Sequence, residues 1–335
     1  MPRLADPQQA ALAVAGELLL PHAAEIDAAP VVPRRYLDAL AAAGLYGLFG
    51  PTECGGLDAD PLTAARVVET LGGASLATAF VWIQHHSVVR ALAGAAGSEV
   101  RRQWLEPLCQ GRARAGIAYA ALRRPGPPAA VAAPAGDGGW IINGHAPWVT
   151  GWGLIDVVLV GARCGDDVVW LLLDPVAGPA SVVTPVRLDA LDASATVRWE
   201  WRDQAVPAAR VLAIEPFADW LGRDAAGRQL NGYLAVGVAA RCASLLGSSP
   251  LDEAVTAARA GLDAATPATI VKARSEASLL AVRASTALVA AGGGRSVQSG
   301  QPAARLMREA MFLLVFGQTQ EIRTAQLTAL GGLSQ

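Results

Sequence analysis

The sequence predicts an α+β fold with helices first, then a block of strands, then helices to the end. Two observations predict this order. Apolar residues recur at three- and four-residue spacing up to about residue 115, and again from about Asp224. Between these regions, short runs of Val, Ile, Trp and Thr are separated by Gly, Pro and Asp. We therefore expect an N-terminal helical domain at 1–115, a middle β domain at 116–212 and a C-terminal helical domain at 213–335.

The first region shows helix signals throughout. Apolar residues repeat around Leu12 and Leu40, and prolines and glycines interrupt the repeats. Further helices are expected over 61–71, 75–95 and 98–108.

The middle region shows strand signals. Val197, Trp199 and Trp201 alternate with charged residues, which is the pattern of a half-buried strand. Gly165-Asp166-Asp167 lies between two apolar runs and predicts a hairpin turn. Six of the nine tryptophans lie between residues 140 and 201. We therefore expect a small antiparallel barrel or sandwich with tryptophans in it.

The last region resumes the helical repeat near Asp224, with breaks expected at 247–250, 292–294 and 300–302. The three glycines of 292–294 follow a helix and not a strand, so they are not a dinucleotide-binding fingerprint. A helix C-cap is one explanation of these glycines.

Composition narrows the function classes. The 335 residues carry a net charge of −2, so no basic surface indicates nucleic acid or anionic lipid. The N-terminus lacks a signal-peptide pattern, and no uninterrupted apolar run reaches about 18 residues. We expect a cytoplasmic protein without a membrane span. The four cysteines are scattered, with no histidine at ligand spacing, so neither a metal site nor a disulfide scaffold is expected.

Motifs in all three regions resemble the acyl-CoA dehydrogenase family. The first is IQHHSVVRALAGAAGSEVRRQWLEPLCQG, with its His-x-Ser, Gly-Ser and Trp-Leu-x-Pro-Leu pattern. The second is WIINGHAPWVTGWGLIDVVLVGAR, and the third is AARLMREAMFLLVFGQTQEIR, which is similar to an Arg-Phe-Met-Arg-Asp-Ala segment running into Tyr-Glu-Gly-Thr. The resemblance covers nearly the whole chain and implies the family's fold.

This resemblance implies a cofactor and a reaction. FAD would lie across the strand domain and the C-terminal helices, and it would accept a hydride from Cβ of an acyl thioester. A carboxylate would remove the Cα proton. The thioester carrier would be CoA or acyl carrier protein. The chain would form a homo-oligomer, or a hetero-oligomer with a paralogous subunit.

Individual residues match the family's binding positions. Trp148, Val149 and Thr150 match the motif that stacks on the flavin, although an ordinary strand with a packed tryptophan would look the same. Thr319 matches a threonine that contacts cofactor phosphate, with a helix N-cap as the alternative. Arg228 matches an arginine near the acyl-CoA, with a solvated helix arginine as the alternative.

The family's catalytic carboxylate is missing. Its position holds Gly317, followed by Gln318, and the position that some members use instead holds Gly227. Neither glycine nor a neutral amide can accept the proton. Glu321, about one helical turn after Gly317, is a candidate for a relocated base, with a solvated charge as the alternative.

Other acidic and basic side chains have structural explanations. Glu309 and Glu276 are expected on helix surfaces. His85 and His86 lie beside Ser87, but without a third partner or a nucleophile elbow, helix packing explains them better than catalysis. His145 is expected to be exposed in a turn.

Binding motifs are also altered. The family's Thr-Glu-Pro reads Arg123-Arg124-Pro125, and the Gly-Ser-Asp turn after it is lost. An Arg-x-x-Phe-Gly segment, through which a neighbouring subunit holds FAD, has no counterpart between Ser248 and Lys272. The resemblance makes 292–294 the helix-ending Gly-Gly turn near the FAD pyrophosphate of a neighbouring subunit, with a plain C-cap as the alternative. Val289 replaces the glutamine before this turn. The residues that would hold the FAD of a neighbouring subunit are therefore less well kept than those that would hold this chain's own flavin.

Three functions stay open. The first is a divergent FAD-dependent acyl-thioester dehydrogenase with a relocated or absent base. It ranks narrowly ahead because the resemblance is strongest at the flavin face, but enzymatic activity itself is left open. The second is a catalytically inactive subunit that supports an active paralogue. The third is a flavin-free scaffold that binds acyl thioesters.

Overall fold

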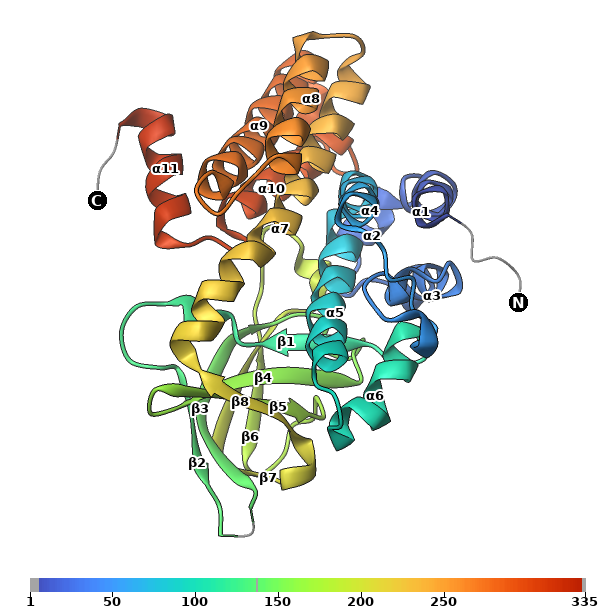
Figure 1. The fold of residues 1–335 in the computed structure, drawn as a ribbon. Coiled ribbons are helices and arrows are strands. Elements are labelled where there is room, and N and C mark those ends of the chain that lie inside the picture. Colours follow the sequence, from blue (N-terminus) through green and yellow to red (C-terminus); the bar gives the residue numbers. More distant parts are fainter. Residues whose placement is uncertain (1–5, 137, 333–335) are drawn as a thin grey trace.

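A computed structural model describes residues 6–136 and 138–332, with the side chains of 225–228 outside this description. In Figure 1 the sheet forms the lower part of the molecule, and helices form the upper part and one flank. The elements follow the predicted order of helices, strands and helices. The division into three domains stays a prediction.

The N-terminal helices form where their sequence signals lie. Asp60, Ser75 and Ser98 each accept a hydrogen bond from a free N–H group at the start of a helix. The three helices predicted from residue 61 onward are therefore present. The elements are α1 (Pro7–Val14), η1 (Ala15–Leu19), α2 (Ala23–Ala28), α3 (Arg34–Ala42), η2 (Leu45–Gly47), η3 (Thr52–Cys54), α4 (Pro61–Ala74), α5 (Leu76–Gly94) and α6 (Glu99–Cys109).

The middle region forms one eight-stranded sheet in the order β6-β7-β3-β2-β4-β5-β8, with β1 beside β4. Most neighbours are antiparallel, as predicted, but β4 runs parallel to both β1 and β2. The sheet is mixed because the β2–β3 hairpin turns the chain twice before β4. The strands are β1 (Ala115–Ala118), β2 (Ala130–Pro134), β3 (Trp140–Val149), β4 (Val157–Cys164), β5 (Asp167–Leu173), β6 (Ser181–Pro185), β7 (Val197–Val206) and β8 (Val211–Pro216), with short helices η4 (Ala120–Arg123), η5 (Asp192–Ser194) and η6 (Ala208–Arg210).

The predicted hairpin turn joins β4 to β5. Cys164 pairs with Asp167, and Gly165 adopts the left-handed φ of 58° that such a tight turn requires. Both strands are buried on both faces. Val158 and Leu171 share one apolar cluster with Trp199, whereas the alternate residues share another with α5 and α6.

The C-terminal helices begin earlier than predicted. Helix α7 starts at Phe217 and not near Asp224, because Phe217 and Trp220 pack against the apolar cluster on the outer face of the sheet. Its start is thus fixed by packing that a local pattern does not show. The elements are α7 (Phe217–Leu246), α8 (Pro250–Asp263), α9 (Ile270–Gly292), η7 (Gly293–Val297), α10 (Pro302–Val315) and α11 (Gln320–Gly331).

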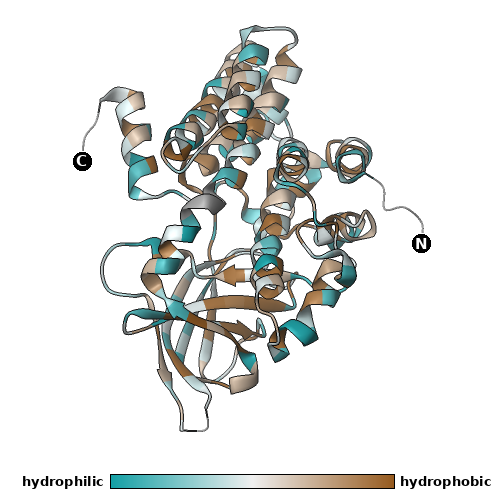
Figure 2. Cartoon of the chain, viewed as in Figure 1, coloured by the Kyte–Doolittle hydropathy of each residue, from teal (hydrophilic) through white to brown (hydrophobic). Residues whose placement is uncertain are grey.

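The two helical regions share one hydrophobic core, which includes Leu40 and Val68 from the first and Val236 and Leu306 from the last. Figure 2 shows hydrophobic residues along the facing sides of these helices. Helices α4 and α7 approach closely where Gly73 meets Gly237. A Cβ atom on Gly73 would lie 2.6 Å from the carbonyl oxygen of Gly237. Only glycine allows this crossing.

One helical stretch, residues 270–297, is long and apolar enough to cross a membrane by length and composition alone. It comprises α9 and η7. In Figure 1 α9 lies within the upper helical bundle, and its side chains Ala277, Ala281 and Ala284 belong to the shared core. Part of its apolar surface is therefore covered by packing in this core.

Candidate functional site

The strand part of the candidate site is the end of β3. Val149 is fully buried, and Thr150 is buried with its hydroxyl 3.3 Å from that of Thr196. Trp148, in contrast, is 42% exposed, although most large apolar side chains of the sheet are buried. Its indole is therefore available to cover an aromatic ligand.

The helical part is the turn between α10 and α11. Gly317 has φ of +62°, so it occupies the left-handed region that favours glycine. A Cβ atom there would lie 2.9 Å from Nδ2 of Asn231 on α7. The position expected to hold the base therefore faces a neutral amide.

A buried cation lies behind this turn. Arg274 on α9 is 1% exposed and donates a hydrogen bond from Nη2 to the carbonyl of Phe316 at 3.0 Å. Burial lowers the pKa of Arg274 to about 10. Among the described residues it has no carboxylate partner. The guanidinium caps the C-terminal end of α10, where the helix dipole favours positive charge.

Of the two predicted binding residues on the C-terminal helices, the structure describes the side chain of Thr319 but not that of Arg228. The Thr319 side chain accepts a hydrogen bond from the N–H group of Ile322 at 3.4 Å, so it is the N-cap of α11. Gln318 donates to the Leu314 carbonyl and to Oε1 of Gln326, which holds α11 against α10. Gly227 and Arg228 belong to α7 by their backbone, but their side-chain positions lie outside the described residues.

The candidate acids do not gather at Gly317. Glu321 is exposed in the first turn of α11, where a carboxylate favours the positive helix end. Glu276 is exposed and pairs with Lys272 at 3.8 Å, as expected of a surface residue. Glu309 is not at the surface as predicted. It is 3% exposed and pairs with Arg305 at 2.6 Å, and burial raises its pKa.

The buried position of Glu309 follows from its neighbours. Its helix α10 runs between the N-terminal and C-terminal helices of the shared core. The buried carboxylate of Glu309 is tolerated because Arg305, one turn earlier in the helix, is buried beside it and pairs with it.

The sequence did not reveal one ion pair near the site. Arg123, at the end of η4, donates from Nε and Nη2 to both carboxylate oxygens of Asp224 on α7, at 2.7 and 2.5 Å. The Arg123 guanidinium also lies 5.4 Å from the Tyr119 ring centroid. The pair ties the loop after β1 to α7. The unusual Arg-Arg-Pro motif was its only sequence signal.

The histidines have structural roles. His85 and His86 are both 1% exposed. Nδ1 of His85 accepts from the Ala115 N–H at 3.1 Å, so its Nε2–H donates to the Tyr46 carbonyl at 3.2 Å. Burial lowers the pKa of His85 to about 3 and that of His86 well below its usual value. Contrary to the prediction, His145 is half-buried, because it lies within β3 and not in a turn.

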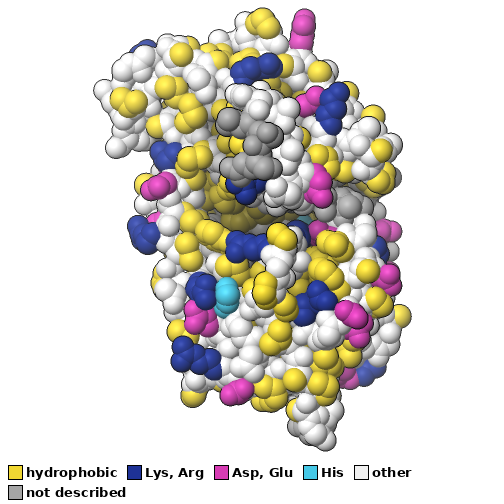
Figure 3. Space-filling model, turned by 90° about the vertical axis from the view of Figure 1, so that its left-hand side faces the viewer, with side chains coloured by type: hydrophobic (Ala, Val, Ile, Leu, Met, Phe, Trp, Pro, Cys, Tyr) yellow, Lys and Arg dark blue, Asp and Glu magenta, His cyan; other side chains and the backbone are white. Residues whose placement is uncertain are grey.

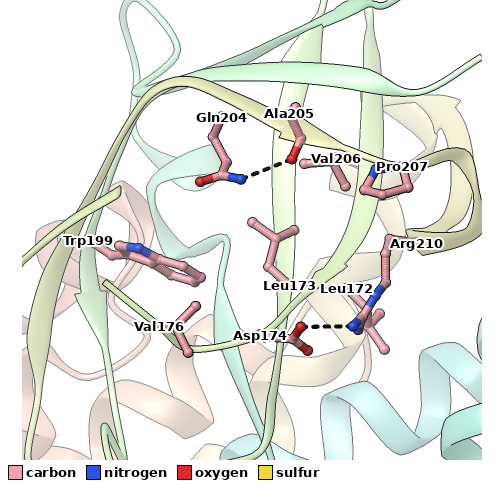
Figure 4. Close-up of a pocket in the computed structure, with 10 residues that line it drawn as sticks. All are labelled: Leu172, Leu173, Asp174, Val176, Trp199, Gln204, Ala205, Val206, Pro207 and Arg210. Atoms are coloured by element: carbon pink, nitrogen blue, oxygen red, sulfur yellow. Dashed lines mark hydrogen bonds and ion pairs between the residues drawn. The ribbon is translucent and has the colours of Figure 1, made fainter. Parts of the chain in front are cut away.

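The surface is hollowed on the side that carries α11. Figure 3 shows hydrophobic side chains in a hollow between the helical part above and the strand part below, with basic side chains around it. A separate cavity of about 140 Å³ lies at the far end of the sheet, between Trp199, Gln204 and the Asp174–Arg210 ion pair (Figure 4). This cavity contains none of the predicted site residues.

Metal ligands do not gather in the described part of the chain, where no group of three or more His, Cys, Asp or Glu could hold an ion. The four cysteines are free thiols.

The sequence and the fold of this chain are both similar to those of known proteins. Residues 5–112 match the family "Acyl-CoA dehydrogenase, N-terminal domain". Butyryl-CoA dehydrogenase from Megasphaera elsdenii has the same fold, with a TM-score of 0.82 at 21% identity over 98% of this chain and 99% of that one. A glutaryl-CoA dehydrogenase from Mycobacterium smegmatis in complex with FADH2 gives 0.80 at 17% identity, covering 98% and 95% of the two chains. The chain is related to the acyl-CoA dehydrogenases.

Curated acyl-CoA dehydrogenase relatives align over shorter stretches. The probable acyl-CoA dehydrogenase fadE25 of Mycobacterium leprae is 30% identical over 144 residues, which is 42% of this chain and 37% of that protein. The probable acyl-CoA dehydrogenase YngJ of Bacillus subtilis is 26% identical over 232 residues, 66% and 61% of the two. The aligned part thus spans less than two thirds of either relative. The acyl-CoA dehydrogenase resemblance read from the sequence is confirmed, as is the fold.

The side chains at the predicted cofactor positions indicate which part of FAD this chain could bind. The Trp148 side chain is partly exposed, so it can contact an aromatic ligand. The hydroxyl of Thr150 is shared with Thr196, and that of Thr319 caps a helix. The residues therefore fit the ring of a flavin better than its phosphates.

Proposed function

We propose that this chain is an acyl-CoA dehydrogenase-fold subunit that supports an active paralogue and supplies no carboxylate base of its own. Its ligand class would be an acyl thioester, and its cofactor FAD. This role is the second of the three functions left open by the sequence.

One observation carries the proposal, namely what surrounds Gly317. The turn has no side chain there, its nearest side-chain neighbour is the amide of Asn231, and the buried cation Arg274 lies behind it. A neutral amide and a guanidinium cannot remove a proton. An acyl thioester needs a base within hydrogen-bond reach of Cα. A carboxylate from another subunit would have to supply that step.

The chain's own residues would hold and orient ligands. Trp148 would cover one face of the flavin ring, Val149 would anchor that strand in the core, and Thr150 would fix its end through Thr196. Bound flavin supplies hydride acceptance. Arg228 is proposed to lie near the acyl thioester, and Thr319 to hold the start of α11.

The dehydrogenase with a relocated base is the less favoured function. Its candidate, Glu321, is exposed in the first turn of α11. A general base works best when it is close to its proton and shielded from water. The exposed position of Glu321 does not meet the second condition.

The visible absorption of flavin tests the proposal. The chain would be purified alone, and after co-expression with a homologue that carries Tyr-Glu-Gly-Thr at the base position. We expect flavin to be retained chiefly in the mixed oligomer. A stable homo-oligomer with one FAD per chain, bleached anaerobically by an acyl-CoA, would overturn the proposal.

A pair of variants at Gly317 tests the missing base. Gly317→Glu adds a carboxylate, and Gly317→Gln adds the same volume without an acid. If only the base is missing, flavin bleaching by an acyl-CoA should appear in the Glu variant alone. Trp148→Ala should lower flavin retention, and unchanged flavin content would argue against the proposed ring face.

A further inference from the structure

Two helices bring a free amide and a buried cation to the turn at Gly317. Asn231 on α7 is half-buried, and its Nδ2 atom is the first atom that a side chain on Gly317 would meet, at 2.9 Å. Among the described residues the Asn231 side chain has no hydrogen-bond partner. It is therefore available to a ligand both as a donor and as an acceptor.

Arg274 flanks the same turn from α9. Its side chain packs against α7 beside Asn231, since a Cβ atom on Gly232 would lie 3.1 Å from Cδ of Arg274. Its guanidinium donates to the carbonyl of Phe316, the residue before Gly317. The cation thus contacts the chain next to both residues of the Gly317–Asn231 contact.

The charge of Arg274 is not compensated. The side chain is 1% exposed, and its Nε–H group is buried without a hydrogen-bond acceptor. In the described part of the chain no carboxylate pairs with Arg274, and burial is the one cause that changes its pKa. A buried cation without a counter-charge is costly, and little water screens its field. The turn therefore has a positive potential where the resemblance to the acyl-CoA dehydrogenases predicts a carboxylate.

An apolar wall adjoins this positive turn. Phe316 packs edge-on against Phe80 of α5, with ring centroids 4.9 Å apart, and Phe312 of α10 packs against both rings. Such rings can hold the methylene groups of an acyl chain. The site thus combines apolar contacts with a free amide and an uncompensated positive charge.

This combination favours an acidic acyl group. An amide N–H group and a nearby cation both stabilise a carboxylate, whereas a glutamate at position 317 would repel it. We propose that the Gly317 turn binds an acyl thioester whose acyl group carries a carboxylate of its own. Asn231 donates to that carboxylate, and Arg274 supplies the counter-charge. The inference rests on the proposed function, from which it takes the acyl thioester as ligand, and it names the class of acyl group.

Isothermal titration of the full chain with two pairs of CoA esters tests the assignment. Malonyl-CoA is compared with propionyl-CoA, and succinyl-CoA with butyryl-CoA, at physiological salt. Each pair has the same carrier and the same number of acyl carbons, so the ratio of the two dissociation constants isolates the carboxylate. We expect the acidic ester to bind about tenfold more tightly in at least one pair. The pair with the larger ratio shows where along the acyl chain the carboxylate lies.

Variants assign this preference to the two side chains. Asn231→Asp places a negative charge at the amide, so the preference should fall below about twofold. Gln103→Glu makes the same change at an exposed position on α6, and this matched control should keep the preference. Arg274→Gln removes the cation and should abolish the preference in a variant that circular dichroism shows to be folded. If that variant does not fold, Asn231→Asp decides the result.

Equal affinities within both pairs, no binding of any of the four esters, or an unchanged preference in Asn231→Asp would overturn the inference. The titration needs neither a bound flavin nor a base, so its outcome is separate from the test of the proposed function. A homo-oligomer with one FAD per chain that an acyl-CoA bleaches would refute the supporting role, and the preference for acidic esters would be measured on that protein in the same way.

Discussion

Arg123 and Asp224 form a two-point ion pair that joins the loop after β1 to helix α7. Their side chains are 23% and 9% exposed, so the pair is largely shielded from water. The first turns of α7 pack on the sheet through Phe217 and Trp220, whereas its second half belongs to the core shared by the helical regions. The pair therefore fixes α7 where it passes from one core to the other.

Removing one partner of this pair should destabilise the protein. Asp224→Asn leaves a shielded guanidinium without its counter-charge, and we expect a loss of about 2 kcal/mol in the free energy of unfolding. Urea denaturation measures it. The exposed Arg35–Glu25 pair is the control, where Glu25→Gln should cost less than about 1 kcal/mol. Equal losses at both sites would contradict the shielded role. A double variant lacking both charges should lose less than the sum of the single variants.

Stability should fall as the solution becomes mildly acidic, because His85 and His86 are buried and neutral. Their folded pKa values lie below the usual 6.5, to about 3 for His85. Above pH 6.5 these two imidazoles are mostly neutral in both the folded and the unfolded chain. Below it the unfolded chain binds the protons first, so each histidine costs about 1.4 kcal/mol per pH unit.

Denaturation at pH 7.0 and 5.5 tests this slope. His86→Phe should reduce the loss by about 1 kcal/mol relative to wild type. His22→Gln, which removes a histidine outside the core, is the control. Comparing proteins removes the contribution of groups common to both, such as Glu309, whose pKa is raised. A slope that is the same in all three proteins would refute the assignment to buried histidine.

Gly317 should tolerate side chains at a modest cost. Gly317→Ala forces a left-handed conformation on an L-residue, which costs about 1 kcal/mol, and places Cβ against the Asn231 amide. Gly97→Ala is the matched control, because Gly97 has a similar φ of +80° and no neighbour within 4 Å of the added atom. The difference between the two variants measures the Asn231 contact, and Asn231→Ala should remove it. No difference would mean that the amide moves away freely.

The α4–α7 crossing should not tolerate a methyl group. Gly237→Ala drives Cβ into the backbone oxygen of Glu69 and close to the nitrogen of Gly73. Backbone atoms cannot move aside as side chains do, so we expect a loss of about 3 kcal/mol or more. Gly222→Ala on the same helix meets nothing within 4 Å. It should instead stabilise the protein by about 1 kcal/mol, by thermal or urea denaturation. Similar effects at both positions would contradict the close crossing.

Local signals predicted much of the fold. Helices α4 to α6 begin at Asp60, Ser75 and Ser98 because their capping side chains lie within three residues of the groups they satisfy. The alternation in β7 and the Gly165 turn are local in the same sense. Such features can be read from a short window of sequence.

Features that depend on distant residues were missed. The start of α7 at Phe217 depends on packing against the sheet, and the parallel pairing of β4 depends on where two earlier strands lie. Glu309 is buried because helices from both ends of the chain enclose it. The Arg123–Asp224 pair joins residues about one hundred positions apart. None of these contacts has a periodic signature.

At the candidate site, the sequence showed which residue types are present, but it did not predict how they are arranged in space. The glycine at position 317 was visible in the sequence, but the Asn231 amide in front of it and the Arg274 cation behind it come from other helices. The exposure of Trp148 likewise depends on how the strand ends.

The glycine contact between α4 and α7 also bears on how the chain is made. During synthesis the first helices leave the ribosome long before α7, α9 and α10, which complete their core. Until then the apolar faces of α4 and α5 lack their cover, and a fragment ending at the sheet would keep them open to water. The nascent chain therefore has to protect these faces, by transient collapse or by a chaperone, until its last third has been translated.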